Sequence, residues 1–142
     1  MARVPSDLRD MKRAFISHNL ASTVMDVPRR AKVMALCYAA ECGLKTILMN
    51  TFGVNNAMDL QPILKARYAK PDLHDIELLC AEASILPTDV GVAPGPFLVA
   101  GTGFEVYKVH EAARYGVKLP DAYLVDVEDW LTKIANAISL RI

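Results

Sequence analysis

The segment HEAARYG, residues 110–116, places a histidine and an arginine four residues apart. On a helix this spacing puts His110 and Arg114 on the same face. Histidine transfers protons near neutral pH and arginine binds phosphate oxygens with a forked donor, so the pair could cleave a phosphodiester without a metal. The alternative, and the commoner case in proteins, is an exposed helix face on which Glu111 and Arg114 form an ion pair worth about 0.2–0.5 kcal/mol.

The chain has only two other histidines, and each has an arginine at a comparable distance. Arg13 and His18 fall within the first expected helix, where five residues of ideal rotation point their side chains about 140° apart. Arg67 and His74 straddle Pro71, so we expect them to lie on two different elements. Neither pair is therefore expected to form a site by itself.

A second possibility is an acid–base pair formed by His74 and Asp75. Because both residues follow Asp72 closely, and Asp is a preferred helix cap, the favoured interpretation is a histidine that packs or hydrogen-bonds at a helix start.

Metal and nucleotide-phosphate sites are not expected. HEAAR matches a zinc-protease motif until its last residue, where Arg114 replaces the histidine that would bind zinc. The cysteines at 37, 42 and 80 form no CxxC pair, which favours thiols in or near a core. Residues 91–103 are rich in glycine but lack the Lys-Ser/Thr of a phosphate-binding loop. We therefore predict no cofactor and no metal.

Composition limits the class of protein. A chain of 142 residues is expected to form a single domain, here spanning residues 1–142, and 53% hydrophobic residues suffice for one core. Sixteen basic and 16 acidic side chains give no net charge, which argues against a protein that coats nucleic acid by charge. The first residues lack the apolar stretch of a signal peptide, and no run of about 18 apolar residues is present. We expect a cytoplasmic protein without membrane contact.

Hydrophobic spacing predicts helices through most of the chain, and hence an all-α up-and-down bundle of five or six helices. The expected helices are one that begins at Ser6 and Asp7, then 28–52, 55–70, 72–84 and 104–115, and one that begins at Asp126. Prolines and glycines make residues 87–103 a loop, either a mobile lid or a partner-binding segment, and residues 116–124 a second loop. Phe97, Leu98 and Val99 form the nearest candidate for a strand, which we expect to be too short to matter.

Three segments in this order resemble the HEPN family, small helical domains of prokaryotic toxin–antitoxin and phage-defence systems. They are YAAECGLKTILMN (38–50), where an acidic residue and a lysine flank small and apolar positions, LHDIELLCAEASI (73–85), which is similar to the family's His-Asp-Leu helix start, and ARYG (113–116) followed by VEDWLTKIANAI (127–138).

The resemblance implies a bundle of four or five helices that is often a homodimer, and active members are metal-independent endoribonucleases. Their signature is an arginine followed, after four to six residues, by a histidine. Here Leu119, Pro120 and Asp121 occupy those positions after Arg114, and no histidine follows His110.

Two functions are therefore predicted. The first is a non-catalytic interaction module, dimeric through the Ala-rich helix 28–52, that binds a partner protein or a small ligand such as a nucleotide in a toxin–antitoxin or defence setting. The alternative is an endoribonuclease acting on RNA with a rearranged pair, His110 and Arg114.

Overall fold

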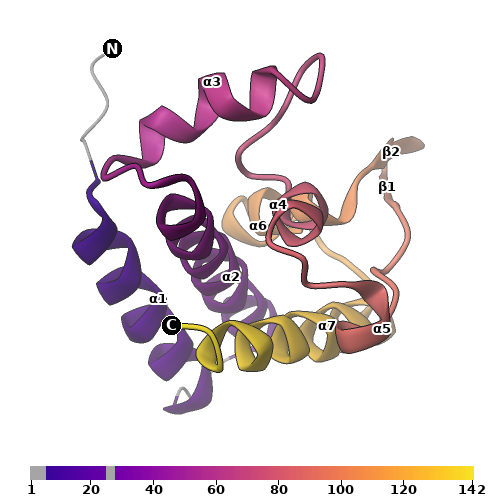
Figure 1. The fold of residues 1–142 in the computed structure, drawn as a ribbon. Helices are drawn as coiled ribbons and strands as arrows, with labels where there is room; N and C mark the ends of the chain where they lie inside the picture. Colours follow the sequence, from indigo (N-terminus) through magenta and orange to yellow (C-terminus); the bar gives the residue numbers. More distant parts are fainter. Residues whose placement is uncertain (1–5, 25–27) are drawn as a thin grey trace.

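The structure is a computed structural model that describes residues 6–24 and 28–142 (Figure 1). The chain is mainly helical, with one small two-stranded sheet. The elements are α1 (Leu8–Val24), α2 (Arg29–Phe52), α3 (Leu60–Lys65), α4 (Ile76–Glu82), α5 (Pro87–Val90), β1 (Phe97–Val99), β2 (Thr102–Phe104), α6 (Val109–Arg114) and α7 (Asp121–Ser139). Short 3-10 helices precede α3, at Ala57–Asp59, and α6, at Val106–Lys108.

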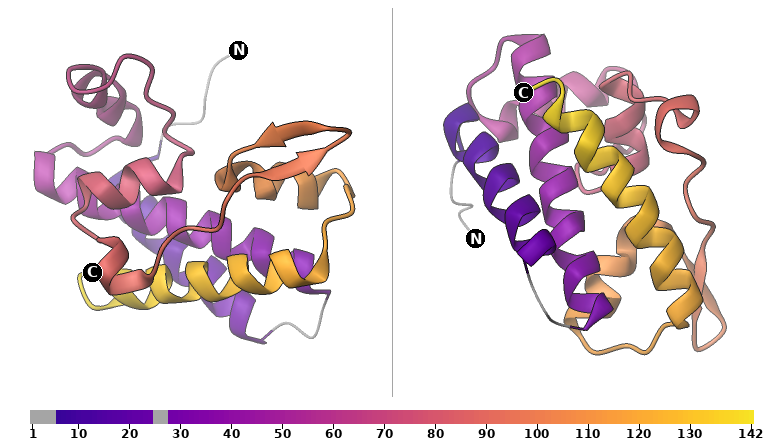
Figure 2. Two further views of the ribbon diagram at one scale, coloured as in Figure 1. Left: turned by 90° about the vertical axis from the view of Figure 1, so that its right-hand side faces the viewer. Right: turned by 90° about the horizontal axis from the view of Figure 1, so that it is seen from below.

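The long helix α2 is the centre of the molecule. Helices α1, α4, α6 and α7 all pack against it (Figures 1 and 2). Its apolar residues lie on more than one face, so it can be buried on more than one side. The predicted bounds, 28–52, are confirmed, and Gly53 ends the helix in the left-handed conformation with φ 68°.

Small residues of α2 let its neighbours approach closely. Ala39 and Ala40 are fully buried, and Gly43 faces Phe15 of α1 and Ile138 of α7. The helices that approach α2 closely, as its small residues predicted, are therefore α1 and α7 of the same chain.

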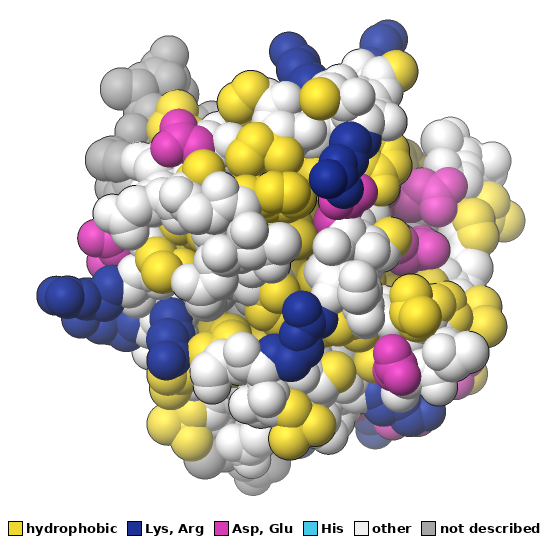
Figure 3. Space-filling view, in the orientation of Figure 1, with side chains coloured by type: hydrophobic (Ala, Val, Ile, Leu, Met, Phe, Trp, Pro, Cys, Tyr) yellow, Lys and Arg dark blue, Asp and Glu magenta, His cyan; other side chains and the backbone are white. Residues whose placement is uncertain are grey.

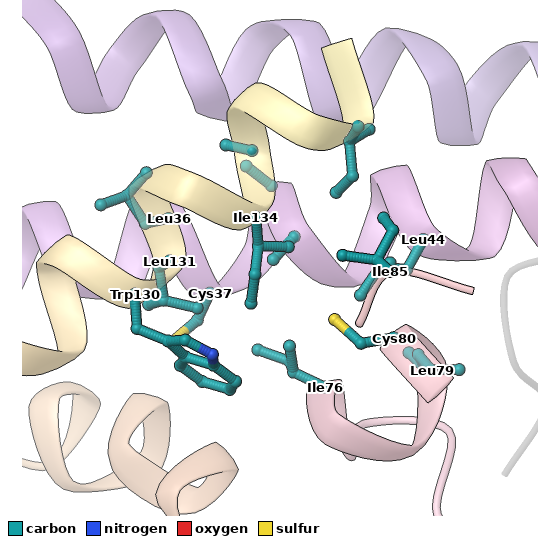
Figure 4. Close-up of a cluster of buried hydrophobic side chains, with 14 of the residues drawn as sticks. Leu36, Cys37, Leu44, Ile76, Leu79, Cys80, Ile85, Trp130, Leu131 and Ile134 are labelled. Carbon is teal, nitrogen blue, oxygen red and sulfur yellow. The ribbon is translucent and has the colours of Figure 1, made fainter. Parts of the chain in front are cut away.

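The buried side chains form one hydrophobic core between α2, α4 and α7. Figure 4 shows Trp130 and Leu131 of α7 beside Cys37 of α2, with Ile76 of α4 facing them. This core fixes α4 and α6 on α2, and these elements carry the candidate site.

Several predicted boundaries were wrong. In place of a helix over 55–70, the chain forms a 3-10 turn and the short α3. The helix expected over 72–84 begins only at Ile76, because the carboxylate of Asp75 accepts the Leu78 N–H and caps it there. The last helix begins at Asp121 and not at Asp126, since Pro120 sets the backbone just ahead of its first turn.

The segment 87–103 was predicted as a loop, but it contains α5, which was not predicted. It also contains β1, which coincides with the strand candidate Phe97, Leu98 and Val99 and, contrary to expectation, forms part of a sheet. Strand β1 pairs antiparallel with β2, with Phe97 opposite Phe104, so Phe104 ends a strand and does not begin a helix. Positive φ angles at Ala100 and Gly101 make the tight connection. The hairpin lies over α6 (Figure 2, left).

Lysine and arginine side chains are scattered over the face shown in Figure 3 and do not gather in one patch there. Within the described residues, no helix combines the length and the apolar character that crossing a membrane requires.

Candidate functional site

The histidine predicted to do chemistry lines a pocket of about 270 Å³ between α2, α6 and the turn before α4. We call this the histidine pocket; its lining residues are Cys37, Tyr38, Glu41, His74, Ile76, His110, Glu111, Arg114 and Tyr115. His110 and Arg114 share one helix face, as their spacing predicts, and both line the pocket. The structure adds a second histidine, His74, from a distant part of the sequence.

His74 is oriented by a carboxylate of α2. Its Nδ1 lies 2.6 Å from Glu41 Oε1, and its backbone N–H donates to the Asp72 side chain at 2.9 Å. Since a carboxylate only accepts, Nδ1 carries the proton and donates it to Glu41. The remaining nitrogen, Nε2, can exchange a proton with a ligand.

The hydrogen bond to Glu41 raises the pKa of His74, although partial burial opposes the charged form. Burial by itself would raise the pKa of Glu41, but the hydrogen bond from His74 and the nearby Lys45 outweigh it and lower that pKa. Lys45 Nζ lies 3.3 Å from Glu41 Oε2. Glu41 is therefore an anion that stabilises a protonated His74.

His110 is held in a different way. Its Nδ1 lies 2.6 Å from the backbone carbonyl oxygen of Tyr107, which can only accept, so Nδ1 is again the donor. No carboxylate holds this ring within the described part of the chain. With Nδ1 as the donor, Nε2 is the ring nitrogen of His110 that can exchange a proton with a ligand. The two imidazole ring centres, of His74 and His110, are 6.4 Å apart.

Arg114 is the last residue of α6, and its guanidinium lies 5.5 Å from the centre of the Tyr115 ring. The predicted ion pair between Glu111 and Arg114 is not found among the described residues; Glu111 instead pairs with Lys108 at 3.3 Å. In the described part of the chain Arg114 has no carboxylate within 4 Å. Its charge is therefore available to an anionic ligand.

The other sequence candidates fall outside the pocket lining. His18 lies against Tyr38, with ring centres 5.6 Å apart, and Arg13 is exposed on α1. Arg67 pairs with Glu82 at 2.7 Å and not with His74.

His74 and Asp75 do not form the acid–base pair considered from the sequence, because each makes a different contact. Asp75 caps α4, whereas the ring of His74 turns to Glu41.

The sequence also predicted that the three cysteines lie in or near the core as thiols and that the chain has no metal site. Cys37 and Cys80 are buried, Cys42 is half-buried, and all three are free. Burial raises the pKa of Cys37 and of Cys80 to about 12, so neither is a nucleophile at neutral pH. Among the described residues, no group of three or more His, Cys, Asp or Glu side chains is arranged to hold a metal ion.

Sequence reasoning did not identify Glu41 as a partner of His74, 33 residues away. The available signal was the acidic residue and lysine, Glu41 and Lys45, one helical turn apart inside a buried helix, because a buried charge requires a partner.

Comparison of the chain with protein-family models, with curated proteins and with solved structures finds no match.

Proposed function

We propose that this protein cleaves RNA in the histidine pocket without a metal ion. The observation that carries the proposal is that two histidines in different hydrogen-bonding environments line one pocket together with Arg114, which pairs with no carboxylate of the described residues. This favours the alternative predicted from the sequence over the non-catalytic module. Pairs of titratable groups whose environments differ are typical of acid–base catalysis.

The two environments assign the proton transfers. His110 acts as the base and accepts the proton of the ribose 2′-OH at Nε2, and the 2′ oxygen forms a bond to phosphorus. The bond from phosphorus to the 5′ oxygen breaks, and protonated His74 donates its Nε2 proton to that oxygen. The products are a 2′,3′-cyclic phosphate and a 5′-hydroxyl end. A separation of 6.4 Å between the ring centres allows both rings to hydrogen-bond to one phosphodiester, at about 2.7–2.9 Å each.

Arg114 supplies the positive charge that the phosphate needs as negative charge develops on its oxygens. A forked donor suits this role better than the point charge of a lysine. With no net charge on the chain, RNA affinity depends on this local cation and on His74, and not on a broad basic surface.

The proposal takes the bundle to be HEPN-like and the protein to act in the cytoplasm as a growth-arresting or defence effector. In the family signature a histidine follows the arginine. Here His74 and His110 both precede Arg114 and take over the proton transfers.

The test is cleavage of a short oligoribonucleotide by the purified protein in the presence of EDTA. We expect cleavage to fall at least about 100-fold in His74→Ala and in His110→Ala, because general acid–base groups contribute about 10²–10⁴-fold. Arg114→Ala should lose as much, and Arg114→Lys should recover part of it. His18→Ala is the matched control, since this third histidine lies outside the pocket lining.

A second control replaces the 2′-OH of the substrate with hydrogen, which removes the nucleophile. Cleavage that persists in this substrate, or that survives loss of either pocket histidine, would refute the mechanism. Mass spectrometry of the products must show the cyclic phosphate.

The non-catalytic interaction module remains the second candidate, and exposed apolar side chains favour it. Ile16 and Leu20 lie one turn apart on α1 and are exposed. Ala39 and Ala40 of the predicted dimer helix are buried within the chain, so they are not available to a second copy, whereas Ile16 and Leu20 are. Sedimentation of the wild type and of Ile16→Lys tests this: a dimer that becomes a monomer, with no RNA cleavage, would favour the module.

A further inference from the structure

A second, mainly apolar pocket of about 150 Å³ adjoins the first, between the β1–β2 hairpin and α6. We call it the hairpin pocket; its lining includes Phe97, Val99, Phe104, Lys108, Glu111 and Tyr115. We propose that it holds one base of a single-stranded RNA next to the phosphate that is cleaved. This inference rests on the proposed function only in placing that phosphate in the histidine pocket.

The pocket provides aromatic surface for a base. The rings of Phe97 and Phe104 are stacked, with centres 5.9 Å apart and planes 29° apart. Tyr115 adds a third ring, and this residue is 73% exposed. Every base has a flat π face, so aromatic side chains bind bases of single strands with little dependence on sequence.

The two pockets share lining residues, so a ligand of the hairpin pocket lies next to a ligand of the histidine pocket. Glu111 and Tyr115 line both, and Arg114 lies between them in the sequence, with its guanidinium over the Tyr115 ring. A phosphate bound by Arg114 therefore has Tyr115 directly beside it. The nearest base of the same strand can reach the hairpin pocket without a long linker.

Charge and size agree with this occupant. Lys108 and Glu111 both line the pocket and pair with each other at 3.3 Å. Lys108 has further N–H donors for a neighbouring phosphate or a base carbonyl, and the carboxylate of Glu111 has a second oxygen that can accept from a base amino group. A pocket of about 150 Å³ is small compared with the 300–1,000 Å³ of typical sites for drug-sized ligands, and suits one ring system. A double helix is excluded, because its bases are stacked on each other and not available to the pocket.

The experiment measures binding, so that it does not depend on cleavage. Two fluorescent trinucleotides are titrated with the wild-type protein: one fully 2′-O-methylated, which blocks attack by the 2′ oxygen, and one with the same backbone but no bases. We expect the ligand with bases to bind about 5- to 150-fold more tightly, the range that corresponds to stacking of one base. Phe104→Ala should remove most of this difference and leave the affinity of the base-free ligand unchanged.

Leu98→Ala is the matched control. Leu98 belongs to the same hairpin, is 71% exposed, and lies on the opposite side of β1 from Phe97 and Val99. It should change neither affinity by more than about twofold. Phe104→Trp keeps an aromatic ring and should keep the preference for the ligand with bases.

Three results would overturn the proposal. The first is equal affinity of the wild type for both trinucleotides, or binding of neither. The second is a loss in Phe104→Ala that is equal for both ligands, because this would mean a structural role for the ring. The third is a preference for bases that Leu98→Ala removes as strongly.

A failure of the proposed cleavage can be distinguished from a failure of the proposed base site. It is tested by His110→Ala on cleavable RNA, whereas the base site is tested by Phe104→Ala on ligands that are not cleaved.

Discussion

Replacing Gly43 by alanine tests the packing that holds α2, the helix that carries Tyr38 and Glu41. A Cβ at this position would lie 2.7 Å from Phe15 Cδ1 and 2.7 Å from Ile138 Cγ2. Carbon atoms pack best at about 3.5–4.0 Å, so one or both side chains must move by about 1 Å. Both side chains are buried, so neither can turn into solvent without leaving the core.

Two effects of opposite sign decide the stability of Gly43→Ala. Alanine in a helix interior is favoured over glycine by about 1 kcal/mol. Adding a methyl group to a filled core costs about 1–3 kcal/mol. We therefore expect a net loss of about 1 kcal/mol in the free energy of unfolding. In a chain of this size that lowers the melting temperature by roughly 2–4 °C.

The assay is urea unfolding followed by circular dichroism, with a double-mutant cycle. Ile138→Ala alone should cost about 2–5 kcal/mol through the cavity it leaves. In that background Gly43→Ala should become less destabilising or even stabilising, with a coupling of at least about 0.5 kcal/mol. Comparing Asp129→Ala with Asp129→Gly, at an exposed position of α7, calibrates the helix-propensity effect separately.

A gain of about 1 kcal/mol in Gly43→Ala, equal to the calibrated helix effect, would show that the methyl group meets no resistance. Zero coupling between Gly43→Ala and Ile138→Ala would show that the added methyl group does not contact Ile138. Either outcome would refute the close approach of α1 and α7 to α2, and with it the framework of the site.

Three further predictions concern titratable groups and a helix cap. Because the pKa of His74 is raised in the folded state, its stabilising effect is complete below its unfolded pKa of about 6.5 and is lost as pH rises through the folded value. Glu41→Gln should therefore destabilise the protein more at pH 5.5 than at pH 8.5, and the difference should be less than about 1 kcal/mol because the pair is partly exposed. Chemical unfolding at both pH values checks this, and an equal loss at both would contradict it. Asp75→Ala removes the N-cap of α4 and should cost about 0.5–2 kcal/mol by urea unfolding, with Asp75→Asn, which keeps an acceptor, largely restoring it. Burial raises the pKa values of the Cys37 and Cys80 thiols to about 12, so in Cys42→Ser these two thiols should react with a thiol reagent at pH 8 only as fast as the protein unfolds. Stability should fall once the pH exceeds about 9, where the thiols of the unfolded chain ionise. Rapid labelling of native Cys42→Ser would exclude the burial of Cys37 and Cys80.

The parts of the fold that could be predicted from the sequence are those in which the hydrophobic periodicity of a helix continues over many residues. Helix α2 has 24 residues with apolar positions on several faces and a glycine stop, so both its bounds and its central place could be inferred. Of the hairpin, the sequence indicated the residues of β1 but not β2 or the pairing of the two strands, because three-residue strands carry too few positions to show alternation. Asp75 replaced Asp72 as the cap of α4 because the two are equally good caps, and only tertiary packing decides which one is used.

For the candidate site, local spacing predicted one part and no more. The four-residue spacing of His110 and Arg114 correctly predicted a shared helix face, since that geometry lies within one helix. The contact between His74 and Glu41 joins residues 33 apart on different elements. It depends on how the turn at Asp72 lies across α2, which no local pattern encodes.

The lack of a histidine after Arg114 counted against catalysis in the sequence, and the structure changes the weight of that argument. An arginine-to-histidine spacing matters chemically only because it delivers an imidazole to the phosphate that the arginine binds. Here one imidazole comes from the preceding turn of the same helix and another from the segment before α4, and both line the pocket that Arg114 lines. The position of a proton-transfer group in the chain is not what the reaction requires. What it requires is an oriented ring with one nitrogen left for proton transfer. The hydrogen bonds of His74 to Glu41 and of His110 to the Tyr107 carbonyl orient the two rings and use only Nδ1, which leaves Nε2 of each for the proposed reaction.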